Sequence, residues 1–548
     1  MKQAKTKFIF VIGGVMSGVG KGVTTASIGR ILQSKGFTVS AIKIDPYVNV
    51  DAGTMNPTVH GEVFVTQDGD ETDQDIGNYE RFLDISLNRV DYMTTGRIYE
   101  TVIARERNLG YHGDNVQVVP DIPNEVIRRI KKSAQQHKSD FVVIEIGGTV
   151  GEYENLIFLE AARMMKLADP DGVLFVLVSY LPIPKMIGEM KTKPTQHASR
   201  TLNSAGLQAD FVVCRSEDPV DQKRRDKIAR FCNISVENVI SAPDAESIYN
   251  VPINFERQNL GNKILGKFHI KANKKDLKDW SAMVARMKRA RQVVPIAVVG
   301  KYFSSGDYVL SDVYISVIEA IKHAGVAVGV KPELHWIDSE DFEKPKADLS
   351  ILKGMKGIIV PGGFGTRGIS GVIRAVKYAR EKKIPYLGLC YGMQLATIEF
   401  ARSVANIPDA QTVEIDPNTK DPIIHINDKQ AANLAAKNMG NSMRLGAYRA
   451  RLKRGSLVHD AYKKTMVSER HRHRYEFNNA YKDRLEKAGL IFSGVCPDNG
   501  LIEIIELPKE THPFFVGTQF HPELQSRPLT PHPLFVAFMR AAVGGKKK

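Results

Sequence analysis

The sequence contains little cysteine, and the cysteines it has are scattered. Four occur in 548 residues (Cys214, Cys232, Cys390 and Cys496), without the spacing of a metal site. We therefore expect free thiols in a reducing cytoplasm, and neither a disulfide framework nor a zinc cluster.

Long hydrophobic runs are also missing, which argues against a membrane-spanning helix. No uninterrupted apolar stretch approaches the roughly 20 residues that a span requires. The short apolar run in "MKQAKTKFIFVIGG" leads directly into a glycine-rich loop. We predict a first β-strand there and not a signal peptide.

Acidic residues are fewer than basic ones, and the formal net charge is +15. The basic residues are dispersed, and no aromatic-basic module of the RNA-recognition type occurs, so we expect no nucleic-acid partner. A basic surface is the simplest interpretation of the charge. The motifs below indicate that a subset of the lysines binds polyanionic small molecules.

What the sequence does contain is an alternation of strand-like apolar runs with helix-compatible segments. Runs such as "VSAIKID", "DFVVIEIGG", "GIIVPGGFG" and "IPYLGLCYG" are typical of parallel strands buried on both faces. We therefore predict an α/β protein with two doubly wound domains. The polar, basic segment 269–292 predicts a linker containing a helix, between a domain of residues 1–268 and one of residues 293–548.

The stretch "FVIGGVMSGVGKGVTTASIG" resembles a phosphate loop but departs from the usual pattern. Val15 stands at the first glycine position, and Gly22 stands where a Ser or Thr normally binds Mg²⁺. The loop still follows a strand and opens a helix, so backbone N–H groups and Lys21 can hold phosphates. A glycine-rich turn without a ligand is the alternative.

Two acidic residues are candidates for the missing metal ligand. Glu145 ends the apolar run "DFVVIEI", and Asp75 lies in the acidic stretch "QDGDETDQDIGNYERF". Mg²⁺ prefers carboxylate oxygen and needs few protein ligands when phosphates supply the rest. Thr24 or Thr25 could substitute for the hydroxyl, and a solvated loop is the alternative for the acidic run.

Lysines in two other stretches fit polyphosphate binding. Lys43 and Asp45 end a predicted strand, and "GEMKTKPTQHAS" combines two lysines with short hydroxyl donors around a proline. Ammonium groups and hydroxyls held in a rigid turn are good phosphate ligands. A solvated basic loop is the alternative for this second stretch.

The second half contains the pattern of a thiol nucleophile. Gly388 and Gly392 flank Cys390 in "GLCYG", which predicts a sharp strand-to-helix turn. We predict that His521 and Glu523, two residues apart in "GTQFHPE", lie on a strand and face the same side. They can then act as the base and the group that orients it. The N–H of Tyr391 and one from "GIIVPGGFG" would form an oxyanion hole. A cysteine peptidase remains the alternative for this half.

The thiol site has the pattern of a glutamine amidotransferase, and such a glutaminase joined to a nucleotide site suggests ammonia transfer, with phosphorylation by ATP activating an oxygen for displacement. At this point the chain resembles the CTP synthase family nearly from end to end. The resemblance rests on "GGVMSGVGKG", "KIDPYVNVDAGTMNP", "IEIGGTVGEYE", "KTKPTQH", "VPGGFGTRG", "GLCYGMQL", "RHRHRYEFN" and "GTQFHPE", in the order and spacing of the family. Another ATP-dependent amidotransferase and a partition-type ATPase are the alternatives.

The resemblance implies a dethiobiotin-synthetase-like P-loop amidoligase domain followed by a class I glutamine amidotransferase domain. ATP would phosphorylate the 4-oxygen of UTP, with Lys21 and Lys43 at the phosphates and Asp75 and Glu145 holding Mg²⁺. Ammonia from glutamine would then displace phosphate to give CTP. The family also implies activation by GTP, feedback inhibition by CTP and a homotetramer.

Residue by residue, the resemblance implies binding roles for five groups of positions. ATP and neighbouring UTP phosphates would contact Ser17, Gly18, Val19, Gly20, Lys21 and Gly22; the pyrimidine nucleotide would contact Glu152, Tyr153 and Glu154; a triphosphate would contact Lys191, Thr192, Lys193, Pro194, Thr195, Gln196 and Lys227; adenine would contact Asp244; and glutamine would contact Gly363, Tyr391, Gly392, Met393, Gln394, Glu414 and Arg474.

The sequence departs from the family most clearly in "LGYHGDNVQVVPDIP", residues 109–123, which corresponds to the family's lid. His112 stands where leucine is common, and Asn115, Asp121 and Pro123 replace Thr, His and Thr. The family ties this lid to GTP activation and to the ammonia entrance. The sequence therefore leaves open the strength of GTP activation, and equally the CTP affinity, filament formation and the role of the basic C-terminal tail.

Overall fold

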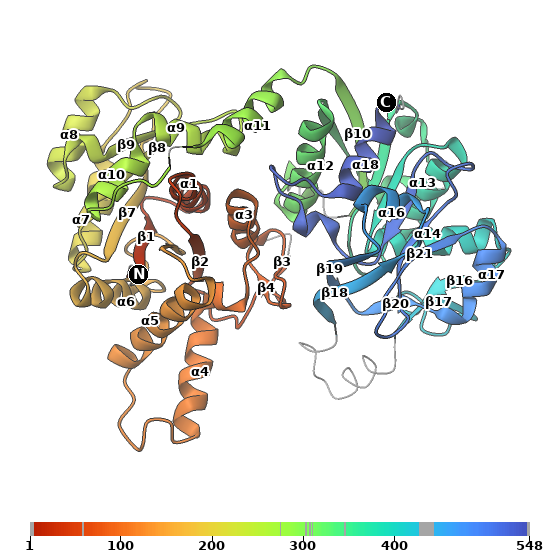
Figure 1. Cartoon of the computed structure of the whole chain (residues 1–548), viewed down its shortest axis with the longest axis horizontal. Coiled ribbons are helices and arrows are strands. Elements are labelled where there is room, and N and C mark those ends of the chain that lie inside the picture. The colour runs from red at the N-terminus through yellow and green to blue at the C-terminus, as the bar shows by residue number, and fades with distance from the viewer. Residues whose placement is uncertain are drawn as a thin grey trace. The chain divides into compact units, whose positions relative to one another are not determined.

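The computed structural model describes residues 5–56, 60–274, 276–301, 304–305, 308–309, 311–344, 347–426 and 443–544. The chain forms two compact units (Figure 1). The first comprises Met1–Thr54 and Asp75–Val284, and the second comprises Met55–Gln74 and Ala285–Lys548. Within the described ranges, none of the helices has the length and apolar character needed to cross a membrane.

The first unit is built on a seven-stranded parallel sheet with the order β5-β2-β6-β1-β7-β8-β9. The strands are β1 (Lys7–Gly13), β2 (Val39–Asp45), β5 (Tyr92–Thr94), β6 (Phe141–Ile146), β7 (Val173–Tyr180), β8 (Phe211–Ser216) and β9 (Val239–Pro243). Along β1, Phe10 and Ile12 enter one core while Ile9 and Val11 enter another, so both faces of the sheet are buried.

Helices cover both faces of this sheet. They are α1 (Lys21–Ser34), α3 (Gln74–Leu83), α4 (Thr95–Arg107), α5 (Val118–His137), α6 (Leu156–Ala168), α7 (Lys193–Ser204), α8 (Gln222–Cys232), α9 (Val251–Arg257), α10 (Leu260–Lys267) and α11 (Lys278–Arg289), which runs into the second unit. The divergent lid sequence, residues 109–123, forms most of the connection between α4 and α5 and the first residues of α5, and this region projects from the sheet (Figure 1).

The second unit contains a nine-stranded sheet with the order β13-β10-β14-β15-β23-β22-β21-β18-β19. Its parallel part consists of β13 (Lys331–Asp338), β10 (Val293–Gly300), β14 (Gly357–Val360), β15 (Tyr386–Leu389) and β23 (Phe515–Thr518). An antiparallel part continues it through β22 (Ile502–Glu506), β21 (Ile491–Val495), β18 (Arg444–Leu452) and β19 (Met466–His473).

The predicted α/β class is confirmed in both units, whereas the antiparallel extension of the second sheet was not predicted. Helices α12 (Ile315–Val328), α13 (Ile369–Lys382), α14 (Tyr391–Ser403), α16 (Leu457–Tyr462), α17 (Lys482–Lys487) and α18 (Pro533–Ala542) belong to this unit. A small sheet of β16 (Ala410–Thr412), β17 (Asp421–Ile426) and β20 (Tyr475–Phe477) accompanies them.

A short hairpin of β3 (Phe64–Val65) and β4 (Glu71–Thr72) also belongs to the second unit. The N–H of Ala447 on β18 donates to the carbonyl of Gln67 over 3.0 Å. The backbones of Gly69 and Gly446 approach so closely that a Cβ on Gly446 would lie 2.7 Å from the Gly69 nitrogen. The second unit therefore includes a piece of chain from the first half of the sequence.

Candidate functional site

The phosphate loop lies between β1 and α1, as the sequence predicts. Gly18 and Gly20 adopt left-handed φ angles of 71° and 91°, which glycine permits without strain. Val15 also has a positive φ of 80°, a conformation that a β-branched residue rarely adopts. The turn thus keeps the backbone of a phosphate loop even though valine occupies the first glycine position.

Lys21 begins α1 and is almost fully buried. Its Nζ donates a hydrogen bond of 2.9 Å to the carbonyl of Gly148, beyond the end of β6. Burial lowers the pKa of this ammonium, and the nearby carboxylate of Glu145 partly offsets the shift. The lysine is therefore held beside the loop, where the negative charge of a bound polyphosphate would stabilise the buried ammonium.

A steric contact explains why glycine, and not Ser or Thr, stands at position 22. A Cβ at Gly22 would overlap Oδ1 of Asp75 and lie 2.9 Å from its Cγ. The carboxylate of Asp75 thus fills the space that the side chain of a Ser or Thr would need. Of the two alternative hydroxyls, that of Thr24 is buried and already donates to the Gly20 carbonyl over 2.9 Å, whereas that of Thr25 is buried with no hydrogen-bond partner among the described residues.

Three carboxylates surround the ammonium of Lys43 at the end of β2. Its Nζ forms ion pairs with Asp75, with Glu145 at 2.8 Å and with Asp45 at 3.6 Å. The hydroxyl of Tyr79, on α3, donates to the second carboxylate oxygen of Glu145. No sequence pattern indicated Tyr79, and Asp45 was identified only as the end of a strand.

The electrostatics of this cluster are dominated by burial. Burial raises the pKa values of Asp45 and Glu145, since the charged forms are poorly solvated. Burial opposes the charge of Asp75 as well, but the adjacent Lys43 ammonium outweighs it and lowers the pKa of Asp75. Asp75 is therefore the carboxylate of this cluster that stays ionised most readily.

The donor set fits a magnesium ion that also contacts phosphates. Among the residues that the structure describes, no three His, Cys, Asp or Glu side chains form a ready metal cage. Asp75 and Glu145 instead converge on one cation, Lys43, next to the phosphate loop. Two hard oxygen ligands suffice where a nucleotide supplies the remainder of the coordination shell.

The "KTKPTQ" stretch forms the N-terminus of α7, with Thr192 at the N-cap position and Pro194 in the first turn. Thr195 shares a 2.8 Å hydrogen bond with Ser179 of β7, and Gln196 donates to the Thr192 hydroxyl over 2.9 Å. Helix α7 also packs on the phosphate loop, because a Cβ on Gly14 would lie 2.6 Å from that of Ala198. A helix N-terminus near the loop is a favourable position for phosphates.

The other residues predicted to bind nucleotide are mostly exposed and have few contacts that fix their side chains. Glu152 accepts a 2.9 Å hydrogen bond from the N–H of Thr149, whereas Tyr153 and Glu154 are exposed. Asp244 follows β9 and pairs at 2.9 Å with Arg215. The following candidate residues are exposed to solvent: Ser17, Gly18, Lys193 and Lys227, while Lys191 is half-buried.

Arg215 is a residue that the sequence analysis missed. Its Nε would lie 3.3 Å from a Cβ on Gly20 of the phosphate loop, and its Nη2 bonds to Asp244. It therefore links the loop to the position predicted to contact adenine. Its place at the end of β8, next to β7 in a parallel sheet, was the available signal.

The cysteine of the second unit lies in the predicted strand-to-helix turn. Cys390 follows β15, precedes α14 and has φ 50° and ψ −97°, a strained conformation typical of a nucleophile elbow. A Cβ on Gly388 would lie 2.7 Å from the carbonyl carbon of Gly392, and one on Gly392 would overlap the carbonyl of Val360. Both flanking glycines are therefore required by backbone contacts.

His521 and Glu523 follow β23 in a turn and a short 3₁₀ helix, Pro522–Gln525, so the prediction that they lie on a strand is wrong, but their side chains do pair. His521 Nδ1 is 2.7 Å from Glu523 Oε1. Burial alone would lower the pKa of His521, but the Glu523 carboxylate and the Cys390 side chain raise it well above its usual value. A protonated imidazole between a carboxylate and a thiol is the arrangement of an activated cysteine nucleophile.

Several groups surround the predicted glutamine residues. Glu414 accepts from the N–H of Gly365 over 2.8 Å, and Gln394 Nε2 donates to Tyr475 O over 3.1 Å. Gly363 lies on the same loop as Gly365. Burial raises the pKa of Glu414, and the positive charge of the nearby Arg474 opposes this rise. Tyr391, Gly392, Met393 and Gln394 form the first turn of α14.

Lys301 is a second residue that the sequence did not identify. Its buried Nζ donates to the carbonyls of Phe364 and Gly365 over 3.0 and 2.7 Å, and it lies 4.8 Å from the ring centroid of Tyr391. Burial lowers its pKa to about 8. It fixes the loop opposite the elbow, and "VVGKY" after a strand was the available signal.

These two sites define a class of protein: a P-loop synthetase joined to a cysteine-dependent glutamine amidotransferase. Family models agree, since "CTP synthase N-terminus" matches residues 7–270 and "Glutamine amidotransferase class-I" matches residues 309–541.

Three curated proteins named "CTP synthase" illustrate how closely the chain follows its relatives. The one from Cyanothece sp. is 48% identical and covers 98% of this chain and 96% of its own. The one from Caldanaerobacter subterraneus is 49% identical, covering 98% and 99%, and the one from Pyrococcus furiosus is 50% identical, covering 98% of both. The chain belongs to the CTP synthase family. It is a glutamine-hydrolysing enzyme that converts UTP to CTP with ATP.

Proposed function

We propose that the described residues divide the CTP synthase reaction between the two sites. The observation that carries this proposal is the coexistence, in one chain of this family, of the Cys390–His521–Glu523 arrangement with the Lys21–Lys43–Asp75–Glu145 cluster. By position in the chain, we assign residues 1–268 to the amidoligase part, 269–292 to the linker and 293–548 to the glutaminase part, with the segment Met55–Gln74 folded into the second unit.

In the glutaminase part, the Cys390 sulfur attacks the amide carbon of glutamine. The backbone N–H of Tyr391 and one from the loop containing Gly363 hold the oxyanion. His521, oriented by Glu523, gives a proton to the departing ammonia and then accepts one from the water that hydrolyses the thioester to glutamate. Tyr391 to Gln394, Gly363, Glu414 and Arg474 bind the glutamine.

In the amidoligase part, the γ-phosphoryl group of ATP passes to the 4-oxygen of UTP. Lys21, Gly18, Gly20 and the neighbouring backbone N–H groups hold the phosphates, and Lys43 stabilises the group in transfer. Ammonia then bonds to C4, the C4–O bond breaks, and phosphate leaves. Asp75 and Glu145 would hold Mg²⁺, which would neutralise phosphate charge.

The remaining assignments follow the family. Glu152, Tyr153 and Glu154 contact the pyrimidine nucleotide of UTP or of the inhibitor CTP, Lys191 to Gln196 and Lys227 contact its triphosphate, and Asp244 contacts adenine. We further propose that GTP activates glutamine hydrolysis, that CTP inhibits, that the enzyme is a homotetramer, and that it acts in the cytoplasm, with its four buried cysteines as free thiols.

The test is CTP formation by the purified chain with ATP, UTP and Mg²⁺. Glutamine with and without GTP, and ammonia in place of glutamine, are the nitrogen sources. The proposal expects CTP from both sources and a higher rate with glutamine when GTP is present. ATP hydrolysis that is indifferent to UTP and produces no CTP from either source would instead support a partition-type ATPase.

A further inference from the structure

The β3–β4 hairpin connects the two halves of the reaction along the chain. The hairpin, residues 64–72, belongs to the unit that contains Cys390. Three residues after Thr72 the chain reaches Asp75, which belongs to the first unit and pairs with Lys43. Few residues therefore separate a part of the glutaminase unit from a proposed metal ligand of the synthetase.

Strand β19 holds this hairpin through two arginine side chains. Arg470 is fully buried; its Nη1 donates to the Val65 carbonyl over 3.0 Å, and its guanidinium lies 5.4 Å from the ring centroid of Phe64. Arg472 forms an ion pair with Glu71, with Nε 2.7 Å from Oε1. Both strands of the hairpin are thus attached to β19 by charged groups.

The same two arginines touch the catalytic pair with their backbone. The N–H of His521 donates to the carbonyl of Arg470 over 2.8 Å. The sulfur of Cys390 lies 4.0 Å from the carbonyl of Arg472. A shift of β19 that follows the hairpin would therefore change the positions of the base and the nucleophile relative to each other.

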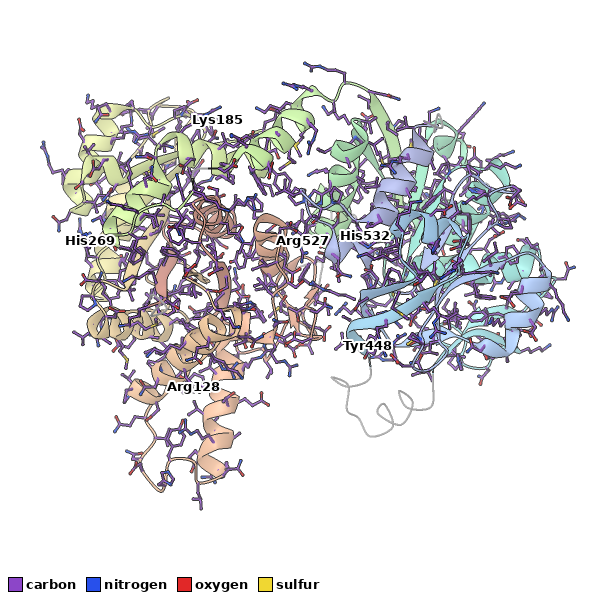
Figure 2. The ribbon with its side chains drawn as sticks, viewed as in Figure 1. Arg128, Lys185, His269, Tyr448, Arg527 and His532 are labelled. Atoms are coloured by element: carbon purple, nitrogen blue, oxygen red, sulfur yellow. The ribbon has the colours of Figure 1, made fainter. Side chains whose placement is uncertain are left out.

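Other side chains of β19 are tied to a buried polar network. His471 and His473 are buried, with 2.9 Å between Nδ1 of the first and Nε2 of the second. Arg444 of the adjacent strand β18 pairs with Glu503 at 2.6 Å, and Tyr448 (Figure 2) meets His471 edge-on at 5.3 Å between centroids. This network stiffens the strand, so that a displacement at one end is carried along it.

We propose that the β3–β4 hairpin couples glutamine hydrolysis to the nucleotide site, with Glu71 as a positioning residue that acts through Arg472 and strand β19. The inference rests on the proposed function, since it assumes that Asp75 moves or becomes fixed when nucleotide and metal bind. Through the hairpin, the change in position or mobility of Asp75 reaches the backbone of β19 that contacts Cys390 and His521.

The experiment compares full-length Glu71→Ala with the unmodified chain by three rates: CTP formation with ammonia, CTP formation with glutamine, and glutamate release. Glu71 pairs with Arg472 of the second unit, whereas Lys43, Asp75 and Glu145 pair with one another in the first, so ammonia-driven synthesis stays near that of the unmodified chain. The CTP formed per glutamine hydrolysed falls by roughly fivefold or more, the lower range of coupling between sites. The pair Glu71→Arg with Arg472→Glu restores part of the ratio by restoring the ion pair.

Asp498→Ala is the control for loss of an ion pair of the same length, 2.7 Å, here an exposed one between Asp498 and Arg449 on β18. It leaves the ratio unchanged. The inference is overturned if Glu71→Ala keeps the ratio of the unmodified chain, or if it lowers ammonia-driven synthesis and basal glutamine hydrolysis together, which would mean a general structural role. If the unmodified chain forms no CTP from ammonia, the proposed function itself has failed.

Discussion

Replacing Gly22 by alanine tests why this phosphate loop lacks the usual hydroxyl. The added Cβ would overlap Asp75 Oδ1 and lie 2.9 Å from Cγ and 3.4 Å from Oδ2. Asp75 is held by Lys43 and by a 3.4 Å hydrogen bond from Asn78, so it cannot turn away without losing a buried ion pair. The substitution should therefore displace the carboxylate.

The change in stability that Gly22→Ala causes is the sum of two opposing contributions. Overpacking a buried site costs about 1–3 kcal/mol. Alanine in place of glycine in a helix contributes roughly 1 kcal/mol in the other direction, and less in the first turn. In an Asp75→Ala background the overlap disappears and only the favourable term remains. The two substitutions should therefore show a coupling energy of about 1–3 kcal/mol, well above the roughly 0.5 kcal/mol expected of independent sites.

Native-state hydrogen exchange of the α1 amides in the four proteins of this cycle measures the coupling. It reports the opening of this helix and avoids assuming one two-state transition for a chain of two units. Ammonia-driven CTP synthesis is the second assay, and Gly22→Ala should lower it at least about tenfold, equivalent to roughly 1.4 kcal/mol. Equal effects of Gly22→Ala in both backgrounds would refute the steric explanation.

Three further predictions concern single residues. Asp75→Ala should weaken Mg²⁺-dependent CTP synthesis from ammonia far more than Thr24→Ala, whose hydroxyl is bound to the Gly20 carbonyl; comparable losses would mean that the threonine holds the metal. Glu523→Gln removes a negative charge that raises the pKa of His521, so the imidazolium loses its proton at lower pH. The alkaline limb of the pH–rate profile for glutamine-driven activity should therefore shift to lower pH. An unchanged alkaline limb would contradict this. Gly392→Ala, whose Cβ would meet the fixed Val360 carbonyl, should abolish glutamine hydrolysis, while Gly354→Ala, with open space around its Cβ, should retain it; full activity of Gly392→Ala would argue against the required close approach.

The parts of the account that the sequence could predict are those encoded by local patterns. The Gly-x-Cys-x-Gly turn and the His521–Glu523 pair depend on a few neighbouring residues, and the structure has that turn and that pair. The α/β class followed from alternating apolar runs, because the central parallel strands of both units are buried on both faces.

The parts that depend on contacts between distant residues could not be predicted. The reason for Gly22 is a carboxylate 53 positions away along the chain, which no local pattern reveals. The attachment of residues 64–72 to β19 joins segments about 400 residues apart, as the ion pair of Arg472 with Glu71 shows. Lys301 and Arg215 stand in ordinary strand ends, and only the fold shows which loops they hold.

The most direct test of the central claim, that glutamine hydrolysis and CTP formation occur at separate sites, is the Cys390→Ala variant assayed with both nitrogen sources. Glutamine-driven CTP formation should be lost while ammonia-driven formation stays close to that of the unmodified chain, because Cys390 belongs to one unit and Lys43, Asp75 and Glu145 belong to the other. Equal loss of both activities in a folded variant would contradict the division into two sites.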